Sequence, residues 1–264
     1  MTVLRSDLLE REGFGHGFGT SRSIPGDFPV DVHILMQVHG ERTVVLSENA
    51  EEEKRRKGEK ETNLRTFCPG ASSPSPLFPF SEAEVVFQNL PAHHFRFDEG
   101  DALVSDISGV SMGIRTADCL PVLIADRVKG TAAAVHCGWR SLALGLAGKA
   151  VRVMTGVMGS RENDLLAAIG PSIGQCCYEV GEEVREAFPA DMREEGLFQK
   201  RGESLYLDLA AGAKTQLLTE GMAPETVDEI VACTSCNPDM FWSWRTRKDE
   251  GRMVSFITVR EPLS

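Results

Sequence analysis

The sequence predicts a mixed α/β fold in which helices cover β-sheets. Short segments rich in Val and Ile, bounded by Gly, Pro or Asp, dominate the first half of the chain. Helical patterns interrupt the strands in the second half. With 264 residues, of which 42% are hydrophobic, the chain is long enough to bury a sizeable core, as one large domain or two small ones.

Ten segments are expected to form strands, because each is short, apolar and limited by residues that favour turns. No internal repeat of fixed period relates them. In chain order they are Val32–Val38, Thr43–Leu46, Glu84–Gln88, Ala102–Ser105, Val110–Ile114, Pro121–Asp126, Thr131–His136, Leu165–Ile169, Glu229–Cys233 and Met253–Val259.

Three segments are expected to form helices. Leu142–Met158 carries apolar residues at helical spacing, and its glycines allow close packing. Val180–Phe188 ends before Pro189, which cannot continue a helix. Leu209–Leu218 follows Asp208, a favourable N-cap.

Residues 47–83 differ in composition from the rest of the chain. A run of mixed charge, Glu51–Lys57, is followed by a stretch rich in Pro and Ser. Such a composition predicts a surface insertion that is partly disordered. Because added loop length costs little closure entropy, a site built from residues on both sides of the insertion can still form.

The charge and cysteine content limit the classes of function. A net charge of −11 disfavours nucleic acid or anionic lipid as the main partner, so an anionic substrate would need a local basic pocket. No signal-peptide core and no membrane-spanning stretch is recognisable. The seven cysteines are therefore expected to stay reduced in a cytoplasmic protein. For the CxxC at Cys233 and Cys236, a free-thiol or packing role is favoured.

Three metal-capable side chains, His39, Cys119 and His136, stand where expected strands end. Each follows an apolar stretch, and Gly or Pro comes soon after it. Two imidazoles and one thiolate form a three-ligand zinc set that leaves a fourth position for water or substrate. The hairpin from Pro121–Asp126 to Thr131–His136 would bring Cys119 and His136 together, whereas His39 depends on tertiary folding.

The same residues permit a second chemistry, in which the His136 imidazole deprotonates the Cys119 thiol for attack on a carbonyl. His39 favours the metal, because a dyad has no need of a third ligand. Arg140 offers a bidentate partner for phosphate or carboxylate. Asp118 could accept a hydrogen bond from a ligand His or serve in a turn, and Asp101 opens a strand.

Two further segments carry weaker signals. The Gly- and Pro-rich stretch Ile169–Gly174 could cradle an anion if a helix followed it, although it lacks the Lys of a phosphate-binding loop. Trp242, Trp244, Arg245 and Arg247 form an aromatic and basic cluster. Core packing with surface charge is the favoured interpretation of this cluster, and stacking on a nucleobase is the alternative.

Seven motifs occur in the order found in the bacterial laccase-domain family, which is also called YfiH-like and was named for polyphenol oxidase. The chain resembles this family over nearly its whole length, apart from residues 47–83. The motifs are Gln37–Gly40, Asp101–Val104, Thr116–Leu123, His136–Arg140, Ile169–Pro171, Cys177–Gly181 and Tyr206–Leu209.

The resemblance implies a single domain over residues 1–264, with a layered α/β/β/α arrangement and mixed sheets. It implies a zinc ion held by His39, Cys119 and His136. It also implies purine nucleoside phosphorylase activity on adenosine, inosine and S-methyl-5'-thioadenosine, with adenosine deaminase activity. The expected partners are purine nucleosides and phosphate, and neither nucleic acid nor a membrane.

Roles for individual residues follow from the same comparison and the chemistry above. The residues assigned to catalysis are Cys119, His136, Arg140 and Asp118. The residues assigned to substrate binding are Arg22, Gln37, Asp101 and Arg245.

Three alternative functions remain open. The first is a cysteine hydrolase or amidase that uses Cys119 and His136, which the family resemblance links to the editing of peptidoglycan precursors. The second is a copper-dependent polyphenol oxidase, although six His without a His-x-His run suit a multicopper site poorly. Copper could still bind adventitiously, because it stands above zinc in the affinity series for such ligands. The third is a binding module without activity.

Overall fold

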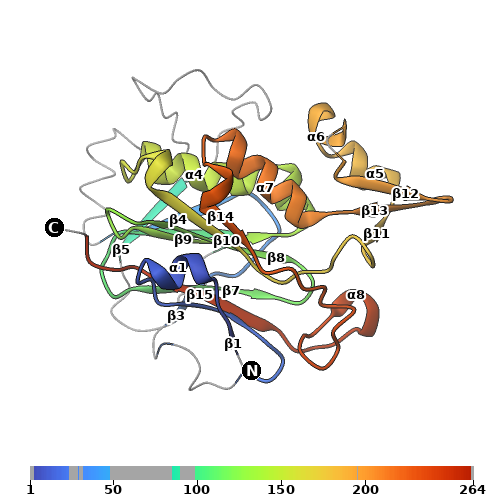
Figure 1. Cartoon of the computed structure of the whole chain (residues 1–264), viewed down its shortest axis with the longest axis horizontal. Helices are drawn as coiled ribbons and strands as arrows, with labels where there is room; N and C mark the ends of the chain where they lie inside the picture. The colour runs from blue at the N-terminus through green and yellow to red at the C-terminus, as the bar shows by residue number, and fades with distance from the viewer. Residues whose placement is uncertain are drawn as a thin grey trace.

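The computed structural model describes residues 3–23, 29, 32–47, 85–89, 99–194 and 196–262. Their strands form a seven-stranded sheet, a five-stranded sheet and a small three-stranded sheet. The two larger sheets lie one above the other, and helices cover the seven-stranded sheet on its other face (Figure 1). The predicted α/β fold class, with mixed sheets in layers, is confirmed. The predicted insertion at 47–83 lies outside the described residues except for Ser47, and the single domain over 1–264 stays a prediction.

The seven-stranded sheet is mixed, with parallel and antiparallel neighbours. Its strands, in spatial order, are β14 (Val227–Glu229), β10 (Leu165–Ile169), β8 (Leu120–Asp126), β9 (Ala132–Cys137), β6 (Ala102–Ser105), β4 (Thr43–Ser47) and β5 (Val85–Asn89).

The five-stranded sheet contains β1 (Val3–Leu4), β2 (His16–Gly19), β15 (Met253–Thr258), β7 (Ser111–Thr116) and β3 (Val32–Ile34), in that order. The three-stranded sheet is β11 (Glu179–Val180), β13 (Ser204–Leu207) and β12 (Phe198–Arg201).

Most described helices are short. They are α1 (Asp7–Arg11), α3 (Trp139–Ala143), α4 (Leu146–Gly156), α5 (Glu182–Glu186), α6 (Ala190–Glu194), α7 (Leu209–Thr219) and α8 (Trp244–Arg247), with 3-10 turns η2 (Glu162–Asp164) and η3 (Pro224–Thr226). None in the described part is long and apolar enough to cross a bilayer.

The central strands are buried on both faces, which explains their near-continuous apolar sequence. Successive side chains of a strand point to opposite faces. Accordingly, Val122 and Ile124 of β8 pack in the cluster that includes α4 and α7, whereas Leu123 packs in the cluster that includes the five-stranded sheet. On β9, Ala132 and Ala134 face the five-stranded sheet, and small side chains there let the two sheets approach closely.

The predicted hairpin is confirmed by the pairing of β8 with β9. Its antiparallel register places Leu120 opposite Cys137 and Pro121 opposite His136. Gly130 adopts a φ of 79° in the turn at the far end, a conformation that glycine tolerates. The two ends of the hairpin that carry Cys119 and His136 therefore lie side by side.

The single helix predicted over Leu142–Met158 is wrong, because two helices, α3 and α4, meet at Gly145, whose φ is 80°. Buried Gln216 of α7 compensates for the break. Its amide donates to the carbonyl of Leu142 at 2.6 Å and accepts from the N–H of Ala147 at 3.2 Å. Two tertiary hydrogen bonds thus satisfy the end of α3 and the start of α4 at the break.

Other differences concern the ends and number of elements. The strand predicted at Glu229–Cys233 lies earlier, at β14, and Cys233 joins only an isolated bridge with Ser172. Val32–Val38 and Val180–Phe188 shorten to β3 and α5. Strands β1, β2, β11, β12 and β13 and helices α1, α6 and α8 were not expected, since they are short or depend on their partners.

Buried His16 of β2 is predicted to make stability depend on pH. Its Nδ1 bonds the carbonyl of Phe14 at 2.9 Å, and its Nε2 accepts the N–H of Ser6, the N-cap of α1, at 2.8 Å. Burial lowers the pKa of His16 below its ordinary value of 6.5, the charge of Arg5 adds to this, and the backbone bonds and Glu10 oppose it. The unfolded chain therefore takes up a proton below about pH 6.5 that the folded chain resists.

The free energy of unfolding should fall as the pH is lowered through this range. Urea unfolding of the wild type and of His16→Gln, at several pH values between 5 and 8, measures the effect. The variant keeps an acceptor for Ser6 but has no proton to gain, so its stability should fall less steeply below about pH 6.5. Equal slopes for the two proteins would show that His16 does not carry the effect.

Candidate metal centre

His39, Cys119 and His136 meet at one end of the two facing sheets. His39 lies in the connection from β3 of the five-stranded sheet to β4 of the seven-stranded sheet. Cys119 lies in the connection from β7 to β8, which crosses between the same two sheets. His136 is the last but one residue of β9. Because β3 and β7 are parallel neighbours, both crossings occur at the same end.

The donor atoms of the three side chains all lie within 4.8 Å of one another. The Sγ of Cys119 is 3.9 Å from Nε2 of His39. The two imidazole rings meet edge to face, with centroids 4.9 Å apart and planes inclined by 76°. His136 is buried, Cys119 is partly exposed and His39 is exposed, so the group is open to solvent on the side of His39.

Gly138 keeps this group compact. A Cβ on Gly138 would lie 3.1 Å from Cδ2 of His39 and 3.4 Å from Sγ of Cys119. The absence of a side chain therefore lets the strand end approach both donors. Two imidazole nitrogens and one sulfur at these separations fit a single zinc or copper ion, which favour such ligands.

Asp101 lies buried beneath the donors, with 1% of its surface exposed. Its Oδ1 accepts the Nδ1–H of His136 at 2.8 Å and the N–H of His39 at 3.0 Å. Its Oδ2 accepts the N–H of Gly40 at 2.7 Å and that of Val38 at 3.3 Å. One carboxylate thus orients the His136 ring, with Nε2 left for a metal, and also holds the loop that carries His39.

The loop that carries His39 has a second attachment. Glu41 forms an ion pair with Lys149, a buried residue of α4. Burial and the nearby charge of Arg152 lower the pKa of Lys149 to about 8. This contact links the helical layer to the connection between the two sheets.

The backbone is strained at one donor, His39, and at Asp118, the residue before a second donor, Cys119. Among the described residues other than glycine, φ is positive only at His39 (59°), Asp118 (89°) and Lys248 (59°). Such conformations cost about 1–3 kcal/mol each and persist only where the surroundings enforce them. The bonds of Asp101 to the His39 loop provide that enforcement on one side of the centre.

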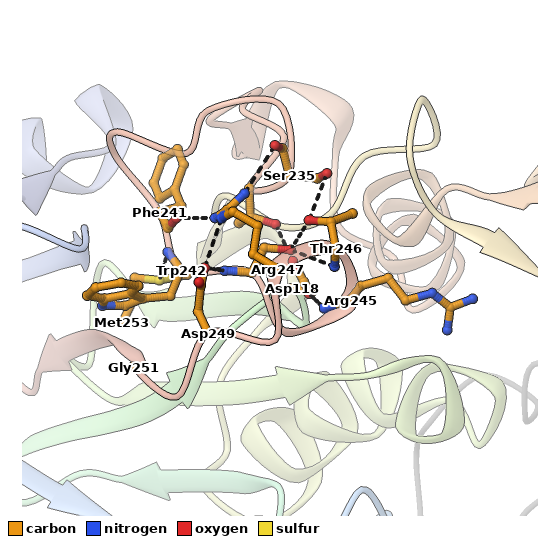
Figure 2. Close-up of polar contacts among 12 residues, drawn as sticks. Asp118, Ser235, Phe241, Trp242, Arg245, Thr246, Arg247, Asp249, Gly251 and Met253 are labelled. Carbon is orange, nitrogen blue, oxygen red and sulfur yellow. Dashed lines mark hydrogen bonds and ion pairs between the residues drawn. The ribbon is translucent and has the colours of Figure 1, made fainter.

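Asp118, next to Cys119, is held from the other side, as Figure 2 shows. Its Oδ1 accepts the hydroxyl of Thr234 at 2.7 Å, and its Oδ2 accepts the N–H of Arg245 at 2.6 Å. Its carbonyl accepts the N–H of Ile173 at 2.9 Å. These bonds fix the turn that presents Cys119. The sequence suggested Asp118 as the acceptor for a ligand His, but Asp118 bonds Thr234 and Arg245, and the acceptor is Asp101.

The charges of the group act on one another strongly. Burial by itself would raise the pKa of Cys119, but His136 and His39 outweigh it through hydrogen bonds and positive charge, and they lower that pKa to about 6. Burial would lower the pKa of His136, yet Asp101 and then Cys119 raise it to about 9. Cys119 is therefore a thiolate at neutral pH, the form that binds metals and attacks carbonyls.

Tyr178 borders the centre, although no role for it was expected. Burial and the charges of Cys119 and Asp118 raise the pKa of Tyr178 to about 12, against the effect of Arg245 and Arg140. The guanidinium of Arg245 lies 5.6 Å from the centre of its ring. The phenol hence stays protonated beside two cations and the thiolate. The Cys177–Gly181 motif was the signal available in the sequence.

Arg140 and Arg245, two of the three arginines assigned from the sequence, are both exposed. Arg140, in the first turn of α3, stacks 4.1 Å over the ring of Trp139. The guanidinium of Arg245 bonds the carbonyl of Glu179 and points away from the network around Asp118 (Figure 2). Both arginines lower the pKa of Tyr178 through their charges, so they supply positive charge near this phenol in an otherwise acidic chain.

The remaining assigned residues lie at the margins of this arrangement. Gln37 donates to the carbonyl of Arg115 at 2.9 Å and accepts its N–H at 2.8 Å, so its amide joins the His39 loop to β7. Arg22 is exposed in the turn after β2, where the N–H of Ser21 donates to the carbonyl of Met240.

The loop Ile169–Gly174 does not present a free anion cradle. The N–H groups of Gly170, Ile173 and Gly174 donate to Pro121, Asp118 and Cys233. A short strand, β11, follows this loop, where anion binding would require a helix. Its backbone donors instead hold the segments around the centre together.

A second group of donors lies near the first. Cys176, Cys177, Cys233 and Cys236 have sulfurs within 4.8 Å of one another. The sequence had not led us to expect that Cys176 and Cys177 would lie close to the CxxC at Cys233 and Cys236. Two pairs of cysteines at short spacing were the signal that could have done so.

A sequence model of the family described as multi-copper polyphenol oxidoreductase laccase matches residues 25–260. The chain belongs to this family. The match spans every donor of both groups. The resemblance seen in the sequence motifs is therefore confirmed.

Proteins that are similar to this chain in sequence are named purine nucleoside phosphorylases, not laccases. The purine nucleoside phosphorylase YfiH of Shigella flexneri is 33% identical over 198 residues, which cover 75% of this chain and 79% of that protein. A purine nucleoside phosphorylase of Aquifex aeolicus is 34% identical over 161 residues, or 61% of this chain and 71% of that protein. The crystal structure of YlmD from Geobacillus stearothermophilus shares the fold, with a TM-score of 0.72, 23% identity and coverage of 99% and 97% of the two chains.

Replacing Asp101 by Asn should weaken metal binding. The variant keeps the shape of the side chain but loses the charge that orients His136, and its NH2 group would face donors. Loss of such a partner typically costs 10–100-fold in metal affinity. A competitive zinc titration against a chromogenic chelator should therefore show one zinc equivalent per chain that binds about 10–100-fold more weakly.

Asp126→Asn is the matched control. Asp126 is also buried and accepts two backbone N–H groups, of Val128 and Lys129, but at the opposite end of β8. It should lower stability and leave zinc affinity unchanged. Equal loss of zinc affinity in the two variants would mean that Asp101 acts only through folding.

Proposed function

We propose that this protein is a zinc-dependent purine nucleoside phosphorylase that acts on adenosine, inosine and S-methyl-5'-thioadenosine and also deaminates adenosine. The relatives named purine nucleoside phosphorylase support the reaction class. The observation that carries the proposal is the meeting of His39, Cys119 and His136, with the charges of Arg140 and Arg245 acting on the neighbouring Tyr178. The substrates would be a purine nucleoside and phosphate.

The phosphorolytic reaction transfers a ribosyl group. A phosphate oxygen forms a bond to C1′ of the ribose while the bond from C1′ to the purine nitrogen breaks, and the released base takes up a proton. Phosphate carries about two negative charges near neutral pH. We assign phosphate binding to Arg140 and Arg245, because guanidinium pairs with phosphate oxygens in a bidentate manner.

Two other side chains bind the substrates or orient a metal-capable residue. Tyr178 keeps its proton at neutral pH, so its hydroxyl can donate a hydrogen bond to the nucleoside or the phosphate. Asp101 is a positioning residue that fixes His136, and its burial leaves it no contact with a substrate. A bound zinc would supply a Lewis acid with an open coordination position.

Zinc is proposed in preference to copper. The name of the family includes multi-copper oxidation, which requires several coppers held by many imidazoles. Within the described residues, the groups of three or more metal-capable side chains are this His2Cys set and the four cysteines. A mononuclear set that is open to solvent on one side suits catalytic zinc, which has three protein ligands and a free position.

One observation supports a second candidate, a cysteine hydrolase or amidase. Cys119, His136 and Asp101 form a chain of interactions in which the thiol is ionised and the imidazole is oriented by a carboxylate. This is the arrangement of an activated thiol nucleophile. The closeness of His39 to the sulfur favours the metal, because a thiol nucleophile gains nothing from a second imidazole there.

The reaction products decide between these functions. The purified chain is incubated with adenosine, with and without phosphate, and the products are identified by mass. Adenine and ribose 1-phosphate that form only with phosphate support phosphorolysis, and inosine supports deamination. Cys119→Ser and His39→Ala should each lose both the bound zinc and at least about 100-fold in rate, as expected for removal of a group that acts in the transition state.

Controls with a chelator and with a thiol-alkylating reagent distinguish a metal-dependent enzyme from a thiol hydrolase. A chelator should abolish turnover, and added zinc should restore it. Turnover on amide substrates that survives chelation and disappears on thiol alkylation would instead establish the hydrolase. Failure of every nucleoside to react would contradict the purine proposal.

Arg140→Ala should raise the KM for phosphate by about tenfold or more, because a hydrogen bond to a charged group contributes about 1.5–3 kcal/mol. Arg140→Lys should give an intermediate KM, since it keeps the charge but not the bidentate geometry. Steady-state kinetics with varied phosphate at saturating nucleoside measures the effect.

Arg161→Ala is the control for this series, because Arg161 is exposed and precedes η2, away from the assigned residues. It should leave the KM for phosphate unchanged. An unchanged KM in Arg140→Ala would remove Arg140 from the phosphate site.

A further inference from the structure

Four cysteines from two segments of the chain lie together beside the candidate metal centre. Cys176 and Cys177 come from the loop before β11, and Cys233 and Cys236 come from the turn after β14. A bridge between Ser172 and Cys233 aligns these two segments. All four cysteines are free thiols, two of them exposed and two partly buried.

The spacing of the sulfurs matches a single tetrahedral ion. The Sγ of Cys236 lies 3.6 Å from that of Cys176 and 3.4 Å from that of Cys177, and all four sulfurs lie within 4.8 Å of one another. A zinc ion bonded to four sulfurs at about 2.3 Å has sulfur–sulfur edges of about 3.8 Å. An iron–sulfur cluster would need a wider cage, because its cysteines surround several metal atoms.

The contacts do not single out a pair for a disulfide. One sulfur, that of Cys236, is nearly equidistant from two others, and Cys176 and Cys177 are adjacent in the chain. Disulfides join sulfurs in exclusive pairs, whereas the sulfur of Cys236 contacts two sulfurs at once. A single central ion would instead be bonded to all four sulfurs.

The surrounding backbone is shaped for thiolates. A Cβ on Gly174 would lie 3.2 Å from the Sγ of Cys176 and 3.6 Å from that of Cys233, so the glycine lets the loop close over both. The N–H of Gly174 donates to the Sγ of Cys233 at 3.2 Å.

We propose that Cys176, Cys177, Cys233 and Cys236 bind one structural zinc ion. Four thiolates at this separation repel one another, and a divalent cation removes the repulsion. Because the protein fills all four positions, this ion has no open position for substrate and serves to hold the fold. The inference rests on these four residues and not on the activity proposed above.

The zinc would stabilise the two segments that border the centre formed by His39, Cys119 and His136. Thr234, between Cys233 and Cys236, donates to Asp118, and Asp118 precedes Cys119. Tyr178 follows Cys177 directly and borders the same centre. One ion thus joins the segment that supports Asp118 to the segment that presents Tyr178.

Metal analysis of separate variants tests the proposal. Protein purified without added metal should contain two zinc ions per chain. Cys236→Ser and Cys176→Ser should each lose one zinc, and Cys119→Ser should lose the other. A zinc content that is the same in Cys236→Ser as in the wild type would overturn the proposal, and iron in place of zinc would overturn the identity of the ion.

A second measurement leaves the four cysteines unchanged, in case Cys236→Ser fails to fold. In Cys119→Ser, X-ray absorption at the zinc edge should show one ion with four sulfur neighbours. A shell that contains nitrogen or oxygen would contradict the site. Intact mass of the wild type under non-reducing conditions should show no loss of hydrogens, whereas a loss of two per disulfide would replace the zinc by a disulfide. Absence of nucleoside turnover would leave all of these results unaffected.

Discussion

The carboxylate of Asp101 is the interaction on which the candidate centre depends. It accepts hydrogen bonds from the His136 ring and from three consecutive backbone N–H groups of the His39 loop. Burial would raise the pKa of Asp101, but the bonds from His136, Gly40 and His39 outweigh it and lower that pKa, so the group remains charged. One buried charge therefore sets the direction of one imidazole and the position of another, although His136 belongs to β9 and His39 to the connection between β3 and β4.

The facing sheets explain why such a group forms at this end of the molecule. Two connections cross from the five-stranded to the seven-stranded sheet, and each contains a non-glycine residue with positive φ, His39 or Asp118. Crossing between layers requires sharp turns, and sharp turns at these residues store strain. Asp101 compensates for one turn, and Thr234 with the N–H of Arg245 compensates for the other. The geometry of the donors is a consequence of how the chain changes layers.

Local pairing could be predicted from the sequence, whereas contacts between distant segments could not. Cys119 and His136 were expected to meet because an antiparallel hairpin brings its ends together, and the register of β8 with β9 confirms this. The break at Gly145 was missed because Gln216, far along the chain, satisfies the broken helix ends. The role of Asp101 was missed for a related reason, since its partners lie 35 to 63 residues away. The metal-capable residue types were recognisable, but their supporting residues were not.

The two donor groups differ in a way that follows from their positions. His39, Cys119 and His136 stand on strand ends and crossings that the sheets hold firmly, and the group is open to solvent on the side of His39. The four cysteines stand on two loops joined by little regular structure, only an isolated bridge and a few hydrogen bonds. Loops without a sheet to hold them gain most from a cross-link that closes a long stretch of chain. The proposed four-thiolate ion at the loops and the proposed three-ligand ion at the sheet ends would therefore complement each other, and the hydrogen bond from Thr234 to Asp118 would link the two groups.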